Sequence, residues 1–167
     1  MLAWLRDPAA VTKLTIDAGQ SIAPDAIKKT LSAMPKLNEL SLSGKKITNA
    51  VITHLAKLPA AKTITSFALM SVSGSVKPDE ALKLIPLMSG LTSLSLACHL
   101  GRDYVLNGLA SNLREARGGG SPLITKLALT ASFGGTYTWS TFQKLGDWFP
   151  ELEELTFANI SDDHVRR

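Results

Sequence analysis

Cys98 and His99 are adjacent in the sequence and are of the residue types that act as nucleophile and base in catalysis. A cysteine becomes a strong nucleophile when a nearby base takes its proton. The two residues are adjacent at the end of an expected strand, where successive side chains point to opposite faces, and nothing supplies an oxyanion hole or an orienting third group. We therefore predict that Cys98 is a buried core residue and that the chain is not an enzyme.

Two further motifs resemble ligand sites without their full chemistry. The triplet Asp162-Asp163-His164 contains metal-ligand types, but it aligns better with a helix start, where acidic residues suit the helix dipole. His54 and His164 have no second ligand at metal spacing. The pair Gly134-Gly135 lacks the glycine spacing and the following Lys-Ser or Lys-Thr of a phosphate loop. We expect no metal and no cofactor.

The same glycine-rich segment offers Tyr137 and Trp139 as a protein-binding edge, because exposed Tyr and Trp are good interface anchors. The alternative is that both aromatic side chains cover the end of the core.

A short repeat organises the elements that must position all of these residues. The pattern Leu-x-x-Leu-x-Leu, with Ile, Val or Phe as substitutes, recurs at residues 11–16, 37–42, 64–69, 91–96, 124–129 and 152–157. Its fourth positions are separated by 26, 27, 27, 33 and 28 residues. The alternation inside each copy is typical of a short strand with one face buried. The longest spacing contains residues 117–122, a glycine-rich stretch that we expect to be a loop.

Between the strands, apolar residues follow helical spacing. We expect helices around residues 26–34, 51–58, 79–88, 104–113 and 138–149. Pro24 and Pro78 stand where a first turn opens, and Thr48 stands where a capping residue is expected. One strand and one helix of this size cannot bury their apolar faces alone, so neighbouring units must stack.

The copy at residues 37–55 most closely resembles the leucine-rich-repeat family, in particular the long repeats of ribonuclease inhibitor and F-box proteins. The family often carries Asn or Cys just after its strand, whereas this chain has Gly19, Gly44, Ser73, Cys98 or His99, and Asn159 there. The resemblance implies an α/β solenoid, a right-handed β-α superhelix of about six repeats, with parallel strands on the concave face and helices on the convex face. Residues 1–167 would form one domain, which is either a fragment of a longer solenoid or has its ends covered by partners.

The resemblance also implies protein recognition, usually on the concave face. Strand alternation predicts three outward rows there, of which the central one is formed by small residues. Such a row leaves room for a partner's helix or loop, while the alternative is that small side chains only tolerate curvature. Ala97 and Ala158 also occupy outward positions. The predicted partner-binding residues are Lys13, Thr15, Asp17, Glu39, Ser41, Ser43, Ser66, Ala68, Met70, Ser93, Ser95, Lys126, Ala128, Thr130, Glu154 and Thr156.

Composition narrows the class of protein further. The net charge of +4 comes from scattered lysines and arginines without a basic tract, which argues against nucleic acid as the partner. A single cysteine favours a reducing compartment, and no apolar stretch approaches the roughly 20 residues of a membrane helix. We expect an intracellular protein of the cytoplasm or nucleus, or of an organelle if a presequence has been removed.

The sequence thus predicts a non-enzymatic scaffold that binds one or more proteins. It is either the substrate-recruiting part of an F-box-like adaptor, a structural subunit of a large stable assembly, or the binding region of an effector whose catalytic domain lies elsewhere. The ends of the repeat array would be covered by neighbouring repeats or subunits.

Overall fold

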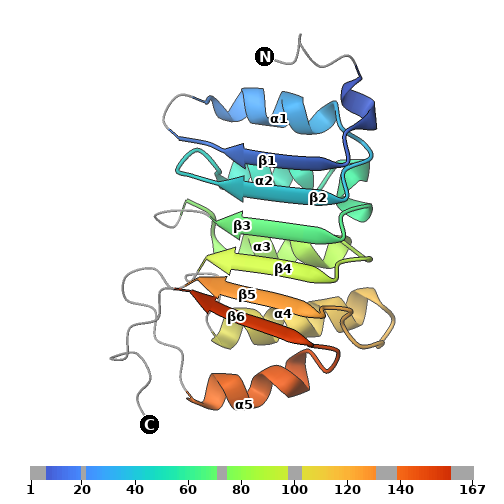
Figure 1. Cartoon of the computed structure of the whole chain (residues 1–167), viewed down its shortest axis with the longest axis vertical. Helices are drawn as coiled ribbons and strands as arrows, with labels where there is room; N and C mark the ends of the chain where they lie inside the picture. Colours follow the sequence, from blue (N-terminus) through green and yellow to red (C-terminus); the bar gives the residue numbers. More distant parts are fainter. Residues whose placement is uncertain (1–6, 20–21, 71–74, 98–102, 131–138, 159–167) are drawn as a thin grey trace.

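In the part of the chain that the structure describes, six short strands alternate with helices (Figure 1). The computed structural model describes residues 7–19, 22–70, 75–97, 103–130 and 139–158. The strands are β1 (Lys13–Asp17), β2 (Glu39–Ser43), β3 (Ser66–Met70), β4 (Ser93–Ala97), β5 (Lys126–Thr130) and β6 (Glu154–Ala158). The helices are α1 (Pro24–Ser32), α2 (Asn49–Leu55), α3 (Pro78–Leu84), α4 (Asp103–Ala116) and α5 (Trp139–Trp148), with short 3-10 turns η1 (Pro8–Ala10), η2 (Pro59–Lys62) and η3 (Ile85–Leu87).

The six strands form one parallel sheet in chain order. The fourth position of each repeat stands in one row across the sheet, as the repeat predicts: Leu14, Leu40, Phe67, Leu94, Leu127 and Leu155 are successive partners. The six-stranded parallel sheet with intervening helices confirms the α/β class and is compatible with a leucine-rich-repeat-like fold. Parallel strands require such crossover connections.

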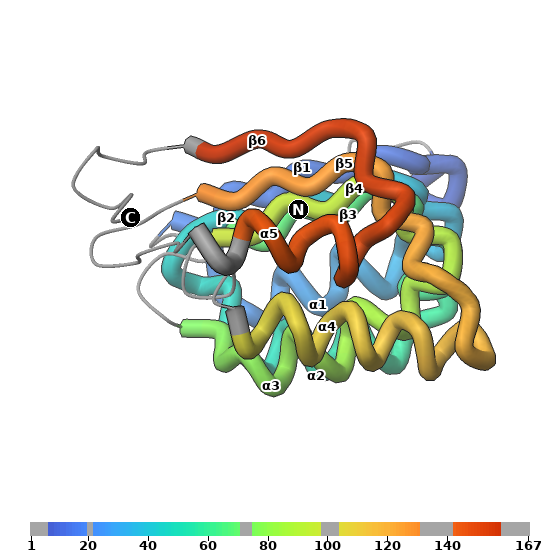
Figure 2. The backbone as a smooth tube through the Cα atoms, turned by 90° about the horizontal axis from the view of Figure 1, so that it is seen from below, coloured from blue at the N-terminus to red at the C-terminus, as the bar shows by residue number. Residues whose placement is uncertain are grey.

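The helices lie in one layer against one face of the sheet (Figure 2). Each helix contacts the next, from α1 to α5. The inward side chains of the strands and the apolar stripes of the helices join in a continuous core, in which Phe67, Leu94 and Phe149 are almost fully buried. Burying such side chains is the main favourable term in folding.

A repeated backbone contact fixes the start of every strand. The carbonyl oxygen of Thr12 accepts hydrogen bonds from Asn38 N at 2.7 Å and from Glu39 N at 3.0 Å. The same two-donor arrangement recurs at the carbonyl oxygens of Asn38, Thr65, Thr92 and Thr125. These bonds hold the second position of each repeat in register with the next repeat, because buried backbone groups must be paired.

The helix boundaries differ in detail from the sequence prediction. Pro24 and Pro78 open α1 and α3 as expected, because proline costs nothing at a position whose N–H has no helical partner. Thr48 is the N-cap residue of α2, as expected, although its side chain makes no capping hydrogen bond. The helix expected over 79–88 ends at Leu84 and continues as η3, because Pro86 lacks the N–H that an α-helix needs.

Gly44 lets two repeats approach after the strands β1 and β2. Its φ is +97°, and a Cβ atom added there would lie 2.3 Å from the carbonyl oxygen of Ala18. That oxygen accepts a hydrogen bond from Lys46 N at 3.2 Å. Gly44 stands where the resembled family often carries Asn or Cys, and only glycine combines this φ with such a close contact.

The sheet ends at β6, where the inward row is only partly covered. Leu155 is 39% exposed, although Phe67 and Leu94 in the same row are each 1% exposed. Phe157 of β6 packs on Phe142 of α5, with ring centroids 4.8 Å apart. Among the described residues, no helix has the length and apolar composition to cross a membrane.

Candidate protein-binding face

The sheet face opposite the helix layer is the candidate site, and we call it the open face. Parallel sheets usually carry helices on both faces, and the described helices here cover only one (Figure 2). Strand register places the predicted binding residues in three rows on the open face. The first row contains Lys13, Glu39, Ser66, Ser93, Lys126 and Glu154; the central row contains Thr15, Ser41, Ala68, Ser95, Ala128 and Thr156; the third contains Asp17, Ser43, Met70, Ala97, Thr130 and Ala158.

Each end of the first row carries an ion pair between neighbouring strands. Lys13 Nζ lies 2.6 Å from Glu39 Oε2, and Lys126 Nζ lies 2.7 Å from Glu154 Oε2. The hydrogen bond to Glu154 and the negative charge of that carboxylate raise the pKa of Lys126. All four side chains are substantially exposed, so these pairs define a charge pattern more than they stabilise the fold.

The central row forms a low strip of half-buried or exposed small side chains. The hydroxyl groups of Ser41, Thr15 and Thr156 make no hydrogen bond to any other described residue. They are therefore available to the polar groups of a binding partner.

Some polar side chains of the third row already have interaction partners within the protein. Ser43 Oγ donates a hydrogen bond to Asp17 Oδ1 at 3.1 Å, and Ser95 Oγ of the central row lies 3.6 Å from Met70 Sδ. Ala97 occupies an outward position as expected, but its side chain is only 7% exposed. A methyl side chain is short enough to be covered by its neighbours even at an outward strand position.

Two hollows lie on the open face, each beside one ion pair. One, of about 240 Å³, is lined by Lys13, Thr15, Glu39, Ser41, Ser66 and Ala68 together with Leu14 and Leu40. The other, of about 110 Å³, is lined by Ser93, Ser95, Lys126, Ala128, Glu154 and Thr156 together with Leu94 and Leu127. Both are smaller than the roughly 300–1,000 Å³ of sites for drug-sized ligands. They suit side chains of a protein partner better than a whole small molecule.

Several predicted features lie outside the described residues. They are Cys98, His99, Tyr137 and the motif Asp162-Asp163-His164. Trp139 is the first residue of α5, and its side chain lies outside the description. The edge site of Tyr137 and Trp139 therefore stays a prediction.

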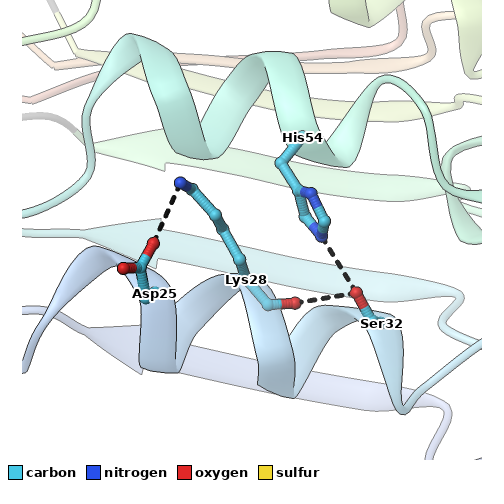
Figure 3. Close-up of polar contacts among 4 residues, drawn as sticks. All are labelled: Asp25, Lys28, Ser32 and His54. Atoms are coloured by element: carbon cyan, nitrogen blue, oxygen red, sulfur yellow. Dashed lines mark hydrogen bonds and ion pairs between the residues drawn. The ribbon is translucent and has the colours of Figure 1, made fainter.

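His54 belongs to a polar contact within the helix layer (Figure 3). Its Nε2 atom lies 2.9 Å from Ser32 Oγ, which donates a hydrogen bond to the carbonyl oxygen of Lys28 at 3.0 Å. The contact between Ser32 and His54 joins α1 to α2. No cluster of three or more metal-ligating side chains occurs in the part of the chain that the structure describes.

Glu80 makes a second polar link between helices. Its carboxylate accepts a hydrogen bond from Lys83 Nζ at 3.0 Å and one from Thr53 Oγ1 of α2 at 3.0 Å. These two hydrogen bonds lower the pKa of Glu80, in that order of size. A surface ion pair of this kind is a structural contact and lies on the helix layer, away from the open face.

Comparison with known proteins supports the fold. A solved structure of the tropomodulin C-terminal domain of Caenorhabditis elegans matches with a TM-score of 0.53 and 11% sequence identity. The match covers 87% of this chain and 86% of that chain. Neither a known protein family nor a curated protein sequence matches this chain. At such low identity the likeness extends to the fold alone.

Proposed function

We propose that this chain is a non-enzymatic protein-binding module of the leucine-rich-repeat type, and that its open face receives a narrow element of another protein. The observation that carries the proposal is the parallel sheet face left open by the helices, whose central row consists of small side chains. A helix or loop of the partner can approach such a face closely, because no long side chain stands between it and the backbone.

The polar groups around this strip support recognition of a protein. The two ion pairs leave the middle of the first row to Ser66 and Ser93, so a charged pair lies at each end of the row and two neutral hydroxyl groups lie between them. A partner with complementary charges would be selected and oriented by this pattern, since electrostatic complementarity governs specificity more than affinity. The hollows next to each pair provide places for partner side chains.

We further propose that the open face is the concave side of a right-handed β-α solenoid. Helices are wider than strands, so a layer of helices on one side favours curvature toward the strands. In that arrangement an inserted helix or loop would contact several strands at once.

The test begins with mass spectrometry of the proteins that co-purify with the tagged chain from its native cells. The main partner is then measured by calorimetry against a variant with Ser41→Arg, Ser95→Arg and Ala128→Arg. We expect binding to be lost while the far-ultraviolet circular dichroism spectrum is retained. Undiminished binding by the folded variant would exclude the open face.

A matched control places the same three charges on the helix layer. Ala50, Asn107 and Gln143 are exposed on α2, α4 and α5, and their replacement by arginine adds equal charge. This control should bind the partner as the parent does. If both variants lose binding equally, net charge and not the open face controls the interaction.

The same purification separates the versions of this function. Recovery of ubiquitin-ligase components would support a substrate-recruiting adaptor of the F-box-like kind. Stoichiometric recovery of one large complex would support a structural subunit, a role favoured by the exposed Leu155 at the β6 end of the sheet.

A further inference from the structure

A groove at the edge of the molecule lies apart from the open face. It opens where the helices lead into the strands, on the side of η2 and η3 (right-hand side of Figure 1). Its volume is about 260 Å³, and its lining includes Lys57, Leu58, Pro59 and Lys62 of one repeat and Leu87 of the next. Leu58 packs against the core from the groove floor.

Leu87 leaves an apolar surface in this groove that the fold itself does not cover. It is 42% exposed, the second most exposed large apolar side chain among the described residues. Its neighbours Ile85 and Met88 are almost fully buried, so the backbone position of Leu87 is held by the core. The groove is therefore a preformed apolar surface, which reduces the ordering cost of binding.

The charged residues that line the groove, Lys57 and Lys62, are both basic. The helix-to-strand connections at residues 33–38, 56–65 and 85–92 contain Lys36, Lys57 and Lys62 and no acidic residue. None of these three lysines forms an ion pair with another described residue. By contrast, the lysines of the open face are paired, as are Lys28 and Lys83 on the helices.

We propose that this groove docks a short acidic segment of a partner protein, with one apolar side chain placed between Leu58 and Leu87 and carboxylates on Lys57 and Lys62. The groove is slightly smaller than sites for drug-sized ligands, so it accommodates a side chain better than a whole cofactor. A peptide is favoured over a nucleic acid because the lining holds no aromatic side chain on which a base could stack.

The binding test uses two peptides and an oligonucleotide with nitrogen-15-labelled protein in NMR titrations. The first peptide is a dodecamer of Glu and Asp with Leu at its centre; the second replaces the Leu by Ser. We expect the Leu peptide to shift amide resonances of residues 56–62 and 85–89, and the Ser peptide to bind more weakly. Absence of shifts, equal binding of both peptides, or stronger binding of a single-stranded oligonucleotide at these resonances would overturn the proposal.

Charge-reversal variants localise the interaction. Lys57→Glu with Lys62→Glu should weaken binding of the Leu peptide about tenfold or more, since each exposed ion pair is worth up to about a factor of five. The control is Lys29→Glu with Lys45→Glu, which changes the net charge equally at exposed lysines elsewhere. Leu87→Ser should reduce binding while leaving the protein folded. Equal losses in both charge variants would contradict a site at the groove.

Discussion

The two faces of the six-stranded sheet differ in how much their residue types vary from repeat to repeat. On the face toward the helices, every repeat supplies Leu, Ile or Phe at equivalent positions, and from β2 to β5 these side chains are almost completely buried. On the open face, equivalent positions vary among Lys, Glu, Asp, Ser, Thr, Ala and Met. This difference indicates that the residues facing the helices determine the stacked fold, while those of the open face can vary to suit a binding partner.

The largest expected effect on stability comes from a substitution in the middle of the buried row of strand residues. Leu94→Ala should lower the free energy of unfolding by about 2–5 kcal/mol, because a buried cavity remains. The matched change Leu155→Ala, in the same row at the exposed end, should cost about half of that or less. Urea denaturation of both variants checks the difference. Equal losses would mean that burial in this row does not vary as the structure has it.

The second largest effect on stability is expected at the contact between Gly44 and Ala18, which joins two neighbouring repeats. Gly44→Ala should destabilise the protein by about 1–3 kcal/mol, because it forces a side chain into a left-handed conformation and against the Ala18 carbonyl oxygen. The control is Gly146→Ala in α5, where an added Cβ meets nothing within 4 Å. That change should stabilise by about 1 kcal/mol through helix propensity. Thermal unfolding of the two variants would show opposite shifts of Tm.

A smaller loss of stability is expected for substitutions on the open face. The variant with Ser41→Arg, Ser95→Arg and Ala128→Arg should lose about 1 kcal/mol of stability or less, because surface substitutions away from packed positions change little. Its urea midpoint is compared with that of Leu94→Ala. A loss as large as that of Leu94→Ala would show that the central row is a packing element and would weaken its role as a binding strip.

The smallest effect is electrostatic and concerns the β5–β6 end of the open face. Glu154→Gln should return the raised pKa of Lys126 toward the ordinary lysine value, because it removes the hydrogen bond and the charge that raise it. The carbon-13 shift of the Lys126 side chain, followed by NMR, measures this. Glu151→Gln is the control and should leave the Lys126 pKa unchanged.

The sign of the linked stability follows from the direction of that shift. The folded pKa lies above the unfolded one, so the ion pair stabilises fully below the ordinary lysine pKa. Its contribution is lost as the pH rises through the raised pKa. The parent and the Glu154→Gln variant should therefore converge in stability at strongly alkaline pH.

The sequence predicted the sheet closely. All six strands and the row of anchor residues from Leu14 to Leu155 stand where the repeat places them. This worked because a period of two residues defines the buried face, and a one-residue slip would turn every apolar side chain outward. Where the sequence prediction failed, as at the end of α3, local competition at a helix terminus decided the outcome.

The candidate surfaces were predicted less completely. Strand alternation placed the binding candidates on the open face, but it did not pair Lys13 with Glu39 or Lys126 with Glu154. Alignment of the repeats would have indicated these pairs, since they occupy equivalent positions in neighbouring copies. The lysine-lined groove was missed altogether, although three successive connections hold three lysines in total and no acidic residue, which was a readable signal.

By itself the sequence determined which residues face inward, because hydrophobic periodicity is a local property that every repeat carries. Only the tertiary structure decided that Gly44 must touch Ala18, that Ala97 is covered, and that Leu87 lies beside Lys57 and Lys62. These contacts join neighbouring repeats about 27 residues apart along the chain. Their distances depend on how the repeats stack, which no local pattern encodes.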